Sequence, residues 1–281
     1  MYPAQFEYFR PATLDEAVKL LAEQGEDAKV LAGGHSLIPA MKLRLARPRA
    51  IIDIGRIAGL SYVRDTGGRL AIGAMTTHAE IAASRLLRER CPLLPETAAH
   101  IGDMQVRNKG TIGGSLVHAD PAADWPAAVL ALDAELEILG PRGRRTLGVD
   151  RFFVGLLETA IAPDEILCEI RVAPTPASVA YEKTEQKASG FALAGVAVVI
   201  DGRASRAAVT GVAATPYRAT RVEQALGSER PITADRIAAA AAHAADGVDA
   251  LGDIHASPDF RIHLAQVNTR RAVARAIERM R

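Results

Sequence analysis

The spacing of hydrophobic residues near the start of the chain alternates between that of a helix and that of a buried strand. It predicts a helix over residues 14–23, which Thr13 and Glu16 can open as a capping box. Short apolar runs predict strands at residues 28–31 and 50–54. Together these elements predict a small α/β unit at the N-terminal end.

Turn signals further along the chain predict two antiparallel hairpins. The turns are the glycine-containing stretches at residues 65–68 and 141–143. The predicted strand pairs are 60–64 with 69–72, and 134–139 with 145–149. Helical periodicity predicts one helix over residues 77–90, and alternation predicts a strand over residues 166–172.

The pattern changes after Pro174 and Pro176. Three strands are predicted beyond this point, at residues 180–183, 192–200 and 207–213. Alanine-rich helices follow from residue 233 to the end of the chain. The change predicts a boundary at the proline pair, with one domain at residues 1–174 and a second at residues 175–281.

Charge, composition and cysteine spacing exclude several classes of protein. A formal net charge of +1 provides no basic field for a phosphate backbone, so nucleic acid is not an expected partner. The N-terminus lacks a secretory signal and the longest apolar run, residues 191–200, is too short to span a bilayer, so we expect a cytoplasmic protein with no membrane span. Cys91 and Cys168 lie far apart without ligand spacing, which predicts no iron–sulfur centre on this chain.

Two glycine motifs, about eighty residues apart, carry the clearest chemical signal. A glycine pair lets backbone N–H groups converge on an anion, and the serine that follows adds a hydroxyl donor. Two such motifs suit the two halves of a pyrophosphate. The motifs consist of Ala32, Gly33, Gly34, His35 and Ser36, and of Thr111, Ile112, Gly113, Gly114 and Ser115.

Several other interpretations of these residues remain open. Neither motif has the lysine of a P-loop or the spacing of a Rossmann fingerprint, which disfavours a nucleotide triphosphatase and a usual NAD-binding domain. Each glycine pair could instead form only a tight turn. Asp120 or Asp124 could cap a helix that has Pro126 at its start, or Asp124 could accept hydrogen bonds from ribose or ring N–H donors.

The sequence resembles the FAD-binding subunit of the xanthine dehydrogenase and aerobic carbon monoxide dehydrogenase family of molybdenum hydroxylases. The first motif continues to Arg44 as Ala-Gly-Gly-His-Ser-Leu-Ile-Pro-Ala-Met-Lys-Leu-Arg. The second begins at Arg107 as Arg-Asn-Lys-Gly-Thr-Ile-Gly-Gly-Ser and leads into Ala-Asp-Pro-Ala-Ala-Asp, ending at Asp124. The similarity extends along nearly the whole chain.

The resemblance implies an α+β fold. It implies a two-lobed α/β FAD-binding domain of the PCMH type, as in vanillyl-alcohol-oxidase-like flavoproteins, with lobes at about residues 1–55 and 56–174. The C-terminal domain would be a three-stranded antiparallel sheet with a helical bundle, of the carbon monoxide dehydrogenase flavoprotein type.

The resemblance also implies which residues contact FAD. Both glycine motifs would cradle the pyrophosphate, Ile101 and Ile161 would contact the adenine or the flavin, and Asp124 would bind a polar edge of FAD. Lys183 is the better match to a flavin-contacting lysine, with Lys187 as the alternative. Phe191 stands where carbon monoxide dehydrogenases have Tyr or Trp, and it can stack on a ring but cannot hydrogen-bond.

The function implied is electron relay. FAD on this chain would take electrons from [2Fe-2S] clusters of a small partner subunit and deliver them to an external acceptor, while a large subunit with the molybdenum cofactor oxidises the substrate. The assembly would be a dimer of heterotrimers. Two alternatives are a free-standing FAD-dependent reductase of the UDP-N-acetylenolpyruvoylglucosamine reductase type, and a scaffold whose glycine motifs are only turns.

Overall fold

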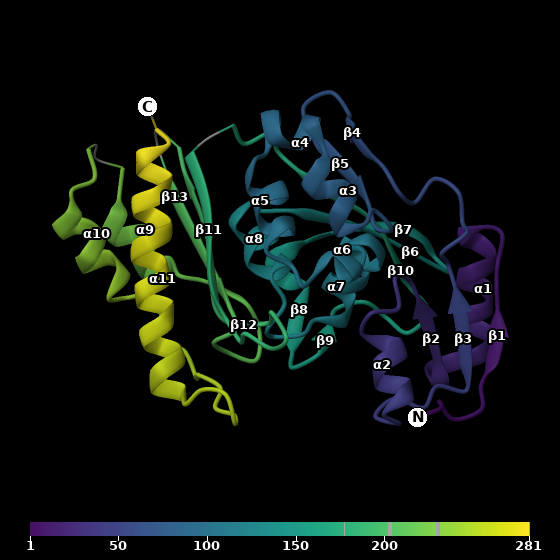
Figure 1. Cartoon of the computed structure of the whole chain (residues 1–281). Helices are drawn as coiled ribbons and strands as arrows, with labels where there is room; N and C mark the ends of the chain where they lie inside the picture. Colours follow the sequence, from purple (N-terminus) through teal and green to yellow (C-terminus); the bar gives the residue numbers. More distant parts are fainter. Residues whose placement is uncertain (177, 202–203, 229–230, 281) are drawn as a thin grey trace.

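Three larger sheets follow one another across the molecule, from an N-terminal lobe at one end to the C-terminal helices at the other (Figure 1). The computed structural model describes residues 1–176, 178–201, 204–228 and 231–280. Residues 177, 202–203, 229–230 and 281, all in the predicted domain 175–281, lie outside the described residues. The mixture of one parallel and two antiparallel sheets with helices confirms the predicted α+β fold class.

The first lobe is a parallel sheet with strand order β1-β3-β2 and a helix packed on it. Its elements are β1 (Glu7–Phe9), α1 (Leu14–Gln24), the 3₁₀ turn η1 (Gly25–Asp27), β2 (Ala28–Leu31), α2 (Leu37–Lys42) and β3 (Ala50–Asp53). The helix and both strands predicted here are confirmed. The hydroxyl of Thr13 caps α1 by accepting a hydrogen bond from the N–H of Glu16. The carboxylate of Glu16 accepts from the N–H of Ala12, whereas a capping box would use the N–H of Thr13.

The second lobe is an antiparallel sheet with strand order β4-β5-β10-β6-β7. Its strands are β4 (Val63–Asp65), β5 (Leu70–Gly73), β6 (Glu135–Gly140), β7 (Gly143–Gly148) and β10 (Ile166–Val172). Both predicted hairpins are confirmed, as β4–β5 and β6–β7. Smaller elements follow them, η2 (Val149–Arg151), β8 (Phe153–Gly155) and β9 (Glu158–Thr159). The turn of the first hairpin is held by Asp65, whose carboxylate accepts from the N–H of Gly67 at 3.0 Å.

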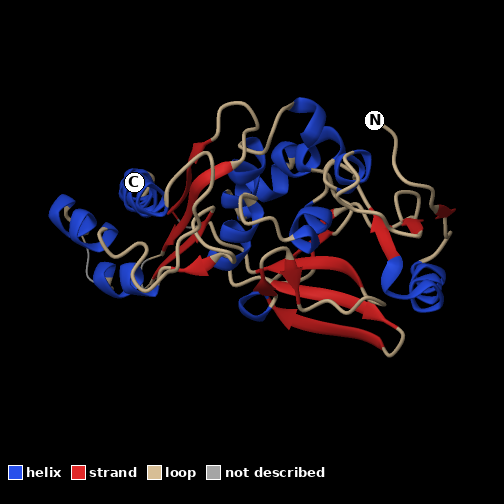
Figure 2. Cartoon of the chain, turned by 90° about the horizontal axis from the view of Figure 1, so that it is seen from below, coloured by secondary structure: helices blue, strands red, loops and turns tan. Residues whose placement is uncertain are grey.

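Short helices cover one face of this sheet, as the view from below shows (Figure 2). They are α3 (His78–Ala83), α4 (Arg85–Arg90), α5 (Leu93–Ala99), α6 (Met104–Lys109), α7 (Ile112–His118) and α8 (Trp125–Ala131). The single helix predicted over residues 77–90 is wrong, because Ser84 has an extended backbone. Its hydroxyl caps α4 by accepting from the N–H of Leu87 at 3.3 Å, so a local side-chain bond ends one helix and starts the next.

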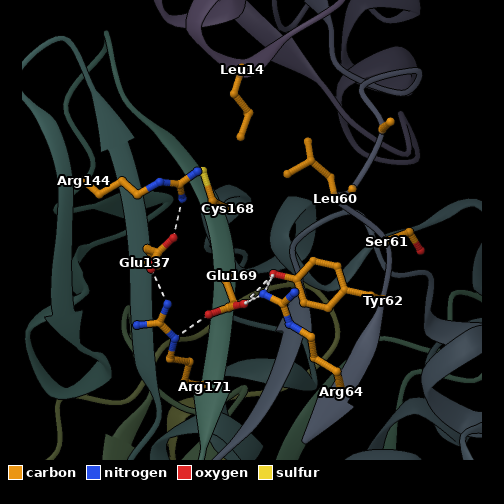
Figure 3. A pocket seen from close by; sticks show the side chains of 12 residues that line it. Leu14, Leu60, Ser61, Tyr62, Arg64, Glu137, Arg144, Cys168, Glu169 and Arg171 are labelled. Atoms are coloured by element: carbon orange, nitrogen blue, oxygen red, sulfur yellow. Dashed lines mark hydrogen bonds and ion pairs between the residues drawn. The ribbon is translucent and has the colours of Figure 1, made fainter. Parts of the chain in front are cut away.

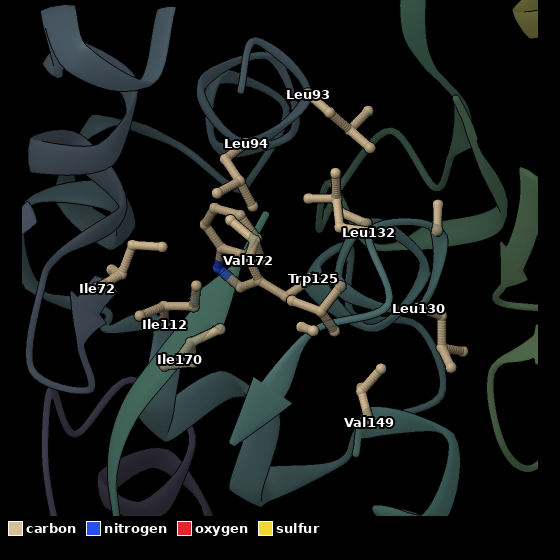
Figure 4. Close-up of a cluster of buried hydrophobic side chains, with 14 of the residues drawn as sticks. Ile72, Leu93, Leu94, Ile112, Trp125, Leu130, Leu132, Val149, Ile170 and Val172 are labelled. Atoms are coloured by element: carbon tan, nitrogen blue, oxygen red, sulfur yellow. The ribbon is translucent and has the colours of Figure 1, made fainter. Parts of the chain in front are cut away.

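The core between sheet and helices is built around Trp125, which is fully buried. Figure 4 shows its indole surrounded by side chains of α5, α7, β5 and β10. The neighbours labelled there include Ile72, Leu94, Ile112 and Ile170. Because so many elements contact this ring, its orientation is fixed by the whole domain.

The C-terminal part is an antiparallel sheet with strand order β11-β12-β13-β14. Its strands are β11 (Ser178–Glu185), β12 (Ala192–Ile200), β13 (Ser205–Thr210) and β14 (Tyr217–Arg218). The three predicted strands are confirmed, and the two-residue β14 adds a fourth at the edge. The helices are α9 (Thr220–Leu226), which begins before the predicted start of helix at residue 233, α10 (Ala234–Ala241) and α11 (Pro258–Glu278).

This sheet is buried on both faces. Side chains that alternate along β11 and β12 enter the core of the second lobe, among them Val179, Tyr181, Ala197 and Val199. The residues between them pack on the C-terminal helices, among them Ala180, Val196, Val198 and Ile200. Burial on both faces explains the unbroken apolar run of β12. Within the described ranges, no helix combines the length and apolarity needed to cross a membrane.

Candidate functional site

The two glycine motifs meet in space. The first follows β2, and the second begins α7. A Cβ on Gly33 would overlap the carbonyl oxygen of Lys109 and lie 2.9 Å from the Cα of Gly110. A Cβ on Gly114 would lie 3.4 Å from the Cβ of Ala32. The fold therefore brings together the two stretches that the sequence separates by about eighty residues.

Their backbones differ, however. Gly34 has a φ of +76°, as a glycine turn requires. Gly113 and Gly114 lie instead in the first turn of α7 and have no positive φ. These two residues are glycine because of crowding: a Cβ on Gly113 would lie 2.6 Å from that of Ala74, and one on Gly114 would lie 2.9 Å from Oγ1 of Thr111.

The free hydrogen-bond donors are also divided unequally between the motifs. Among the described residues, no protein acceptor bonds the backbone N–H groups of Gly33, Gly34 and His35. In the second motif the corresponding groups are used within the protein. The N–H groups of Ile112, Gly113 and Gly114 donate to Thr76 O, Ala74 O and Thr111 Oγ1. The first motif thus offers an anion unpaired N–H groups, while the second lies against it.

The carboxylate of Asp124 makes no capping hydrogen bond at the start of α8, so the predicted role of Asp124 as a helix cap is wrong. It is 5% exposed and accepts a hydrogen bond of 2.6 Å from the hydroxyl of Tyr181. The ammonium group of Lys183 lies 3.1 Å from its Oδ1. Burial raises the pKa of Asp124 to about 6, although Lys183 and Tyr181 both act to lower it.

Lys183 is buried as well, with its side chain 1% exposed. Besides Asp124, its Nζ donates to the carbonyl oxygens of His100 at 2.6 Å and Gly190 at 2.8 Å. The lysine therefore joins β11 to the end of α5 and to the turn before β12. Lys187, the alternative flavin-contacting lysine, is exposed.

The remaining predicted contact residues differ in how deeply they are buried. Ile101 and Ile161 are half-buried against the core of the second lobe. Ile112, by contrast, is fully buried in that core, so its side chain faces away from any ligand (Figure 4). His35 and Ser36 are exposed, and Phe191 has 48% of its surface exposed.

The loop before Asp124 is fastened by the C-terminal sheet, which the sequence did not reveal. Thr210 donates its hydroxyl hydrogen between two carbonyl oxygens, those of Pro121 at 2.9 Å and Ala123 at 2.8 Å. The N–H of Gly211 also donates to Pro121, and the N–H of Ala192 donates to Ala122. These partners are 70 or more residues away in the chain, so no local motif marks them.

A cavity of about 510 Å³ opens elsewhere, on the face of the five-stranded sheet that the short helices do not cover (Figure 3). Its buried Glu169 accepts hydrogen bonds from Tyr62 and Arg64 and pairs with Arg171. Burial disfavours the charge of Glu169, but these three partners outweigh it and lower the pKa. No residue of either glycine motif is among the described residues that line this cavity.

Comparisons with known proteins cover the whole chain. Residues 4–176 match the FAD binding domain in molybdopterin dehydrogenase, and residues 179–276 match the CO dehydrogenase flavoprotein C-terminal domain. The chain belongs to the family of FAD-binding medium subunits of molybdenum hydroxylases. This result favours the resemblance noted in the sequence over a free-standing reductase.

Individual relatives of this family are similar from end to end. The carbon monoxide dehydrogenase medium chain of Hydrogenophaga pseudoflava is 39% identical, with 97% of each chain covered. The nicotine 6-hydroxylase medium subunit of Paenarthrobacter nicotinovorans is 38% identical, with 96% of each covered. Among solved structures, quinoline 2-oxidoreductase from Pseudomonas putida 86 matches with a TM-score of 0.93 and 30% identity, covering 100% of this chain and 99% of that one.

The residues present at the glycine motifs fit FAD. A pyrophosphate needs donors that are not already bonded, and the N–H groups of Gly33, Gly34 and His35 meet that need. Ser115, which could add a hydroxyl donor, directly follows Gly114, where an added Cβ would lie 3.4 Å from the Cβ of Ala32. Medium subunits of this family are components of oxidoreductases, and a flavin supplies the redox chemistry that the side chains here lack.

Proposed function

We propose that this chain holds FAD where its glycine motifs meet and relays electrons from [2Fe-2S] clusters of a small partner subunit to an external acceptor. The observation that carries the proposal is the set of unpaired N–H groups in the first motif, positioned beside the second. Bound FAD accepts electrons one or two at a time, which suits it to link clusters to a two-electron acceptor.

The protein's own groups have separate tasks in this proposal. The N–H groups of Gly33, Gly34 and His35 bind the diphosphate, and the second motif closes against them. Asp124 and Lys183 hold the C-terminal sheet to the FAD-binding domain. Ile101, Ile161 and the half-exposed Phe191 supply apolar surface for the rings. Domain limits of 1–174, with lobes at 1–55 and 56–174, and of 175–281 agree with this division of tasks.

The partners in the proposal are a large subunit with the molybdenum cofactor and a small subunit with the clusters, assembled as a dimer of heterotrimers. Support for partner subunits comes from the relatives, which are named as the medium chain of carbon monoxide dehydrogenase and the medium subunit of nicotine 6-hydroxylase. In this proposal the chain receives its electrons from the clusters of the small subunit. Among the described residues no group of three or more His, Cys, Asp or Glu side chains is arranged to hold a metal ion. A cytoplasmic location stays a prediction from the sequence.

Anaerobic absorption spectra test the relay. The FAD-loaded chain alone should keep its oxidised flavin spectrum when mixed with purines, aldehydes, carbon monoxide or an N-heteroaromatic substrate, yet bleach with dithionite. The complex reconstituted with partner subunits purified from the source organism should bleach with the one substrate that its molybdenum subunit oxidises. Rapid bleaching of the isolated chain by such a substrate, or a purified chain that takes up no FAD, would refute the proposal.

A further inference from the structure

His78, the first residue of α3, is a polar side chain that none of the roles above uses. It is 4% exposed, and its Nδ1 accepts a hydrogen bond of 3.0 Å from Nε1 of Trp125. An indole nitrogen can only donate, so Nδ1 must carry a lone pair and the proton of the neutral ring must be on Nε2. The tautomer is therefore fixed by a residue of the central core.

The other edge of the imidazole touches Gly110, the residue just before the second glycine motif. A Cβ on Gly110 would lie 2.6 Å from Nε2 of His78 and 2.9 Å from its Cδ2. The backbone N–H of His78 also donates to the carbonyl oxygen of Gly110 at 3.0 Å. Gly110 in turn is the residue against which Gly33 packs. A continuous line of contacts thus runs from Trp125 through His78 and Gly110 to the first motif.

We propose that His78 is a positioning residue of the FAD site: a neutral imidazole, fixed by Trp125, that holds Gly110 at the distance from which Gly33 can present its N–H groups to the diphosphate. This inference rests on the proposed function and identifies a residue that supports it from behind. Trp125 suits the task because it is fully buried among the side chains of four elements (Figure 4).

The action of His78 is one of shape and hydrogen bonding, not of charge. Burial lowers the pKa of His78 to about 4, and the electrostatic effects of His35 and Arg107 act in the same direction. The ring is therefore neutral at pH 7. Within the described part of the chain no acceptor bonds its Nε2–H, so the ring can shift if the tryptophan bond is removed.

A compensation experiment tests the contact. Gly110 has an ordinary backbone, with φ −61° and ψ 140°, so alanine there is resisted by its neighbours and not by its own conformation. Gly110→Ala should weaken FAD binding at least about tenfold, measured by flavin fluorescence titration, and lower the Tm of the FAD-free protein. His78→Ala in the same chain should restore part of both losses, because it empties the space that the new methyl group needs.

The matched control is His118→Ala combined with Gly110→Ala, since His118 is an exposed histidine of α7. This pair should behave as Gly110→Ala alone. If Gly110→Ala binds FAD as tightly as the wild type, or if His118→Ala restores binding as well as His78→Ala does, the positioning role is wrong. Simply additive effects of His78→Ala and Gly110→Ala on FAD binding and on Tm would have the same meaning.

A spectroscopic measurement separates this inference from the proposed function. In ¹⁵N-histidine NMR spectra of the FAD-free protein at pH 7, one ring should be a fixed Nε2–H tautomer, and its signals should change in Trp125→Phe. A mixture of tautomers at that ring would overturn the inference. If the wild type takes up no FAD, the proposed function fails, whereas the tautomer and the Tm compensation still decide whether His78 supports Gly110.

Discussion

Gly33 packs against the carbonyl group of Lys109 with no room for a side chain. This contact joins a turn of the first lobe to a residue two positions before the second glycine motif, and it makes the two motifs parts of one site. The unpaired N–H groups of Gly33 and its neighbours lie beside this contact. The fit of the cofactor is therefore as sensitive to lobe packing as to the residues that would touch it.

Gly33→Ala should separate the motifs. The added methyl group would overlap Lys109 O, so one lobe has to shift before FAD can be held. We expect an increase in the Kd for FAD of at least about tenfold, measured by titration of the FAD-free protein, with a loss of stability of roughly 1–3 kcal/mol typical of overpacking.

The matched control for this change is Gly67→Asn. Gly67 has a φ of +77°, a Cβ added there would meet no atom within 4 Å, and asparagine tolerates that backbone. This variant should bind FAD as the wild type does. Equal binding by Gly33→Ala and wild type would show that the lobe contact does not set the site.

Gly114→Val should abolish FAD retention while most of the fold remains. The Cβ of a valine at this position would lie 2.9 Å from Thr111 Oγ1 and 3.4 Å from Ala32 Cβ, so its two methyl groups must enter the space between the motifs. The absorbance ratio of flavin to protein after purification measures retention, and far-UV circular dichroism checks the fold. A variant that kept stoichiometric FAD would show that this turn of α7 does not border the cofactor.

The sequence predicts the glycine motifs and most strands because both depend on neighbours along the chain. The turn of the first hairpin, for example, is held by Asp65 bonding to Gly67 two residues later. The break at Ser84 escapes prediction because the periodicity around it favours a continuous helix, and only its capping bond to Leu87 shows the interruption. Local patterns therefore place elements well and misplace interruptions within them.

The buried polar contacts of the site could not be predicted, because they join distant residues. Asp124 has the spacing of a helix cap, but its partner Tyr181 is 57 residues away. Trp125 and His78 are 47 residues apart. A side chain that bonds across the fold has the same local sequence as one that faces solvent, so pattern alone favoured the simpler role.

Lys183→Met should be strongly destabilising, and this distinguishes it from Lys187. Removing the ammonium group leaves Asp124 buried without its counter-charge and leaves the carbonyl oxygens of His100 and Gly190 without their donor. Breaking a buried ion pair costs about 3–5 kcal/mol, which urea unfolding of the FAD-free protein measures.

Lys187→Met is the control for that change, because Lys187 is exposed and its loss should alter stability by less than about 0.5 kcal/mol. A second variant checks the cause. Adding Asp124→Asn to Lys183→Met removes the uncompensated charge and should recover part of the loss. If the two lysine variants proved equally stable, the ion pair would not be what fastens the C-terminal sheet.

The acid sensitivity of the protein should depend on His78. Its pKa in the folded protein is about 4, against about 6.5 for an unfolded chain. As pH falls below 6.5, His78 binds a proton in the unfolded state but stays neutral in the folded state. The free energy of unfolding therefore decreases until the pH reaches about 4. The full loss from this one residue is roughly 3 kcal/mol. Asp124 acts in the opposite direction, because its pKa is raised to about 6 by burial, and it offsets most of the loss between pH 6 and 4.

The contribution of His78 is therefore measured as a difference between two proteins that both contain Asp124. His78→Asn keeps an acceptor near the position of Nδ1 for Trp125 but does not titrate in this range. Urea unfolding of both FAD-free proteins from pH 7.5 to 4 should show the wild type losing more stability than the variant, with the gap opening below pH 6.5. His118→Asn, at an exposed histidine of α7, should follow the wild-type curve. Parallel curves for wild type and His78→Asn would mean that folding does not lower the pKa of His78. The description of His78 as a buried, neutral ring bonded to Trp125 would then be wrong.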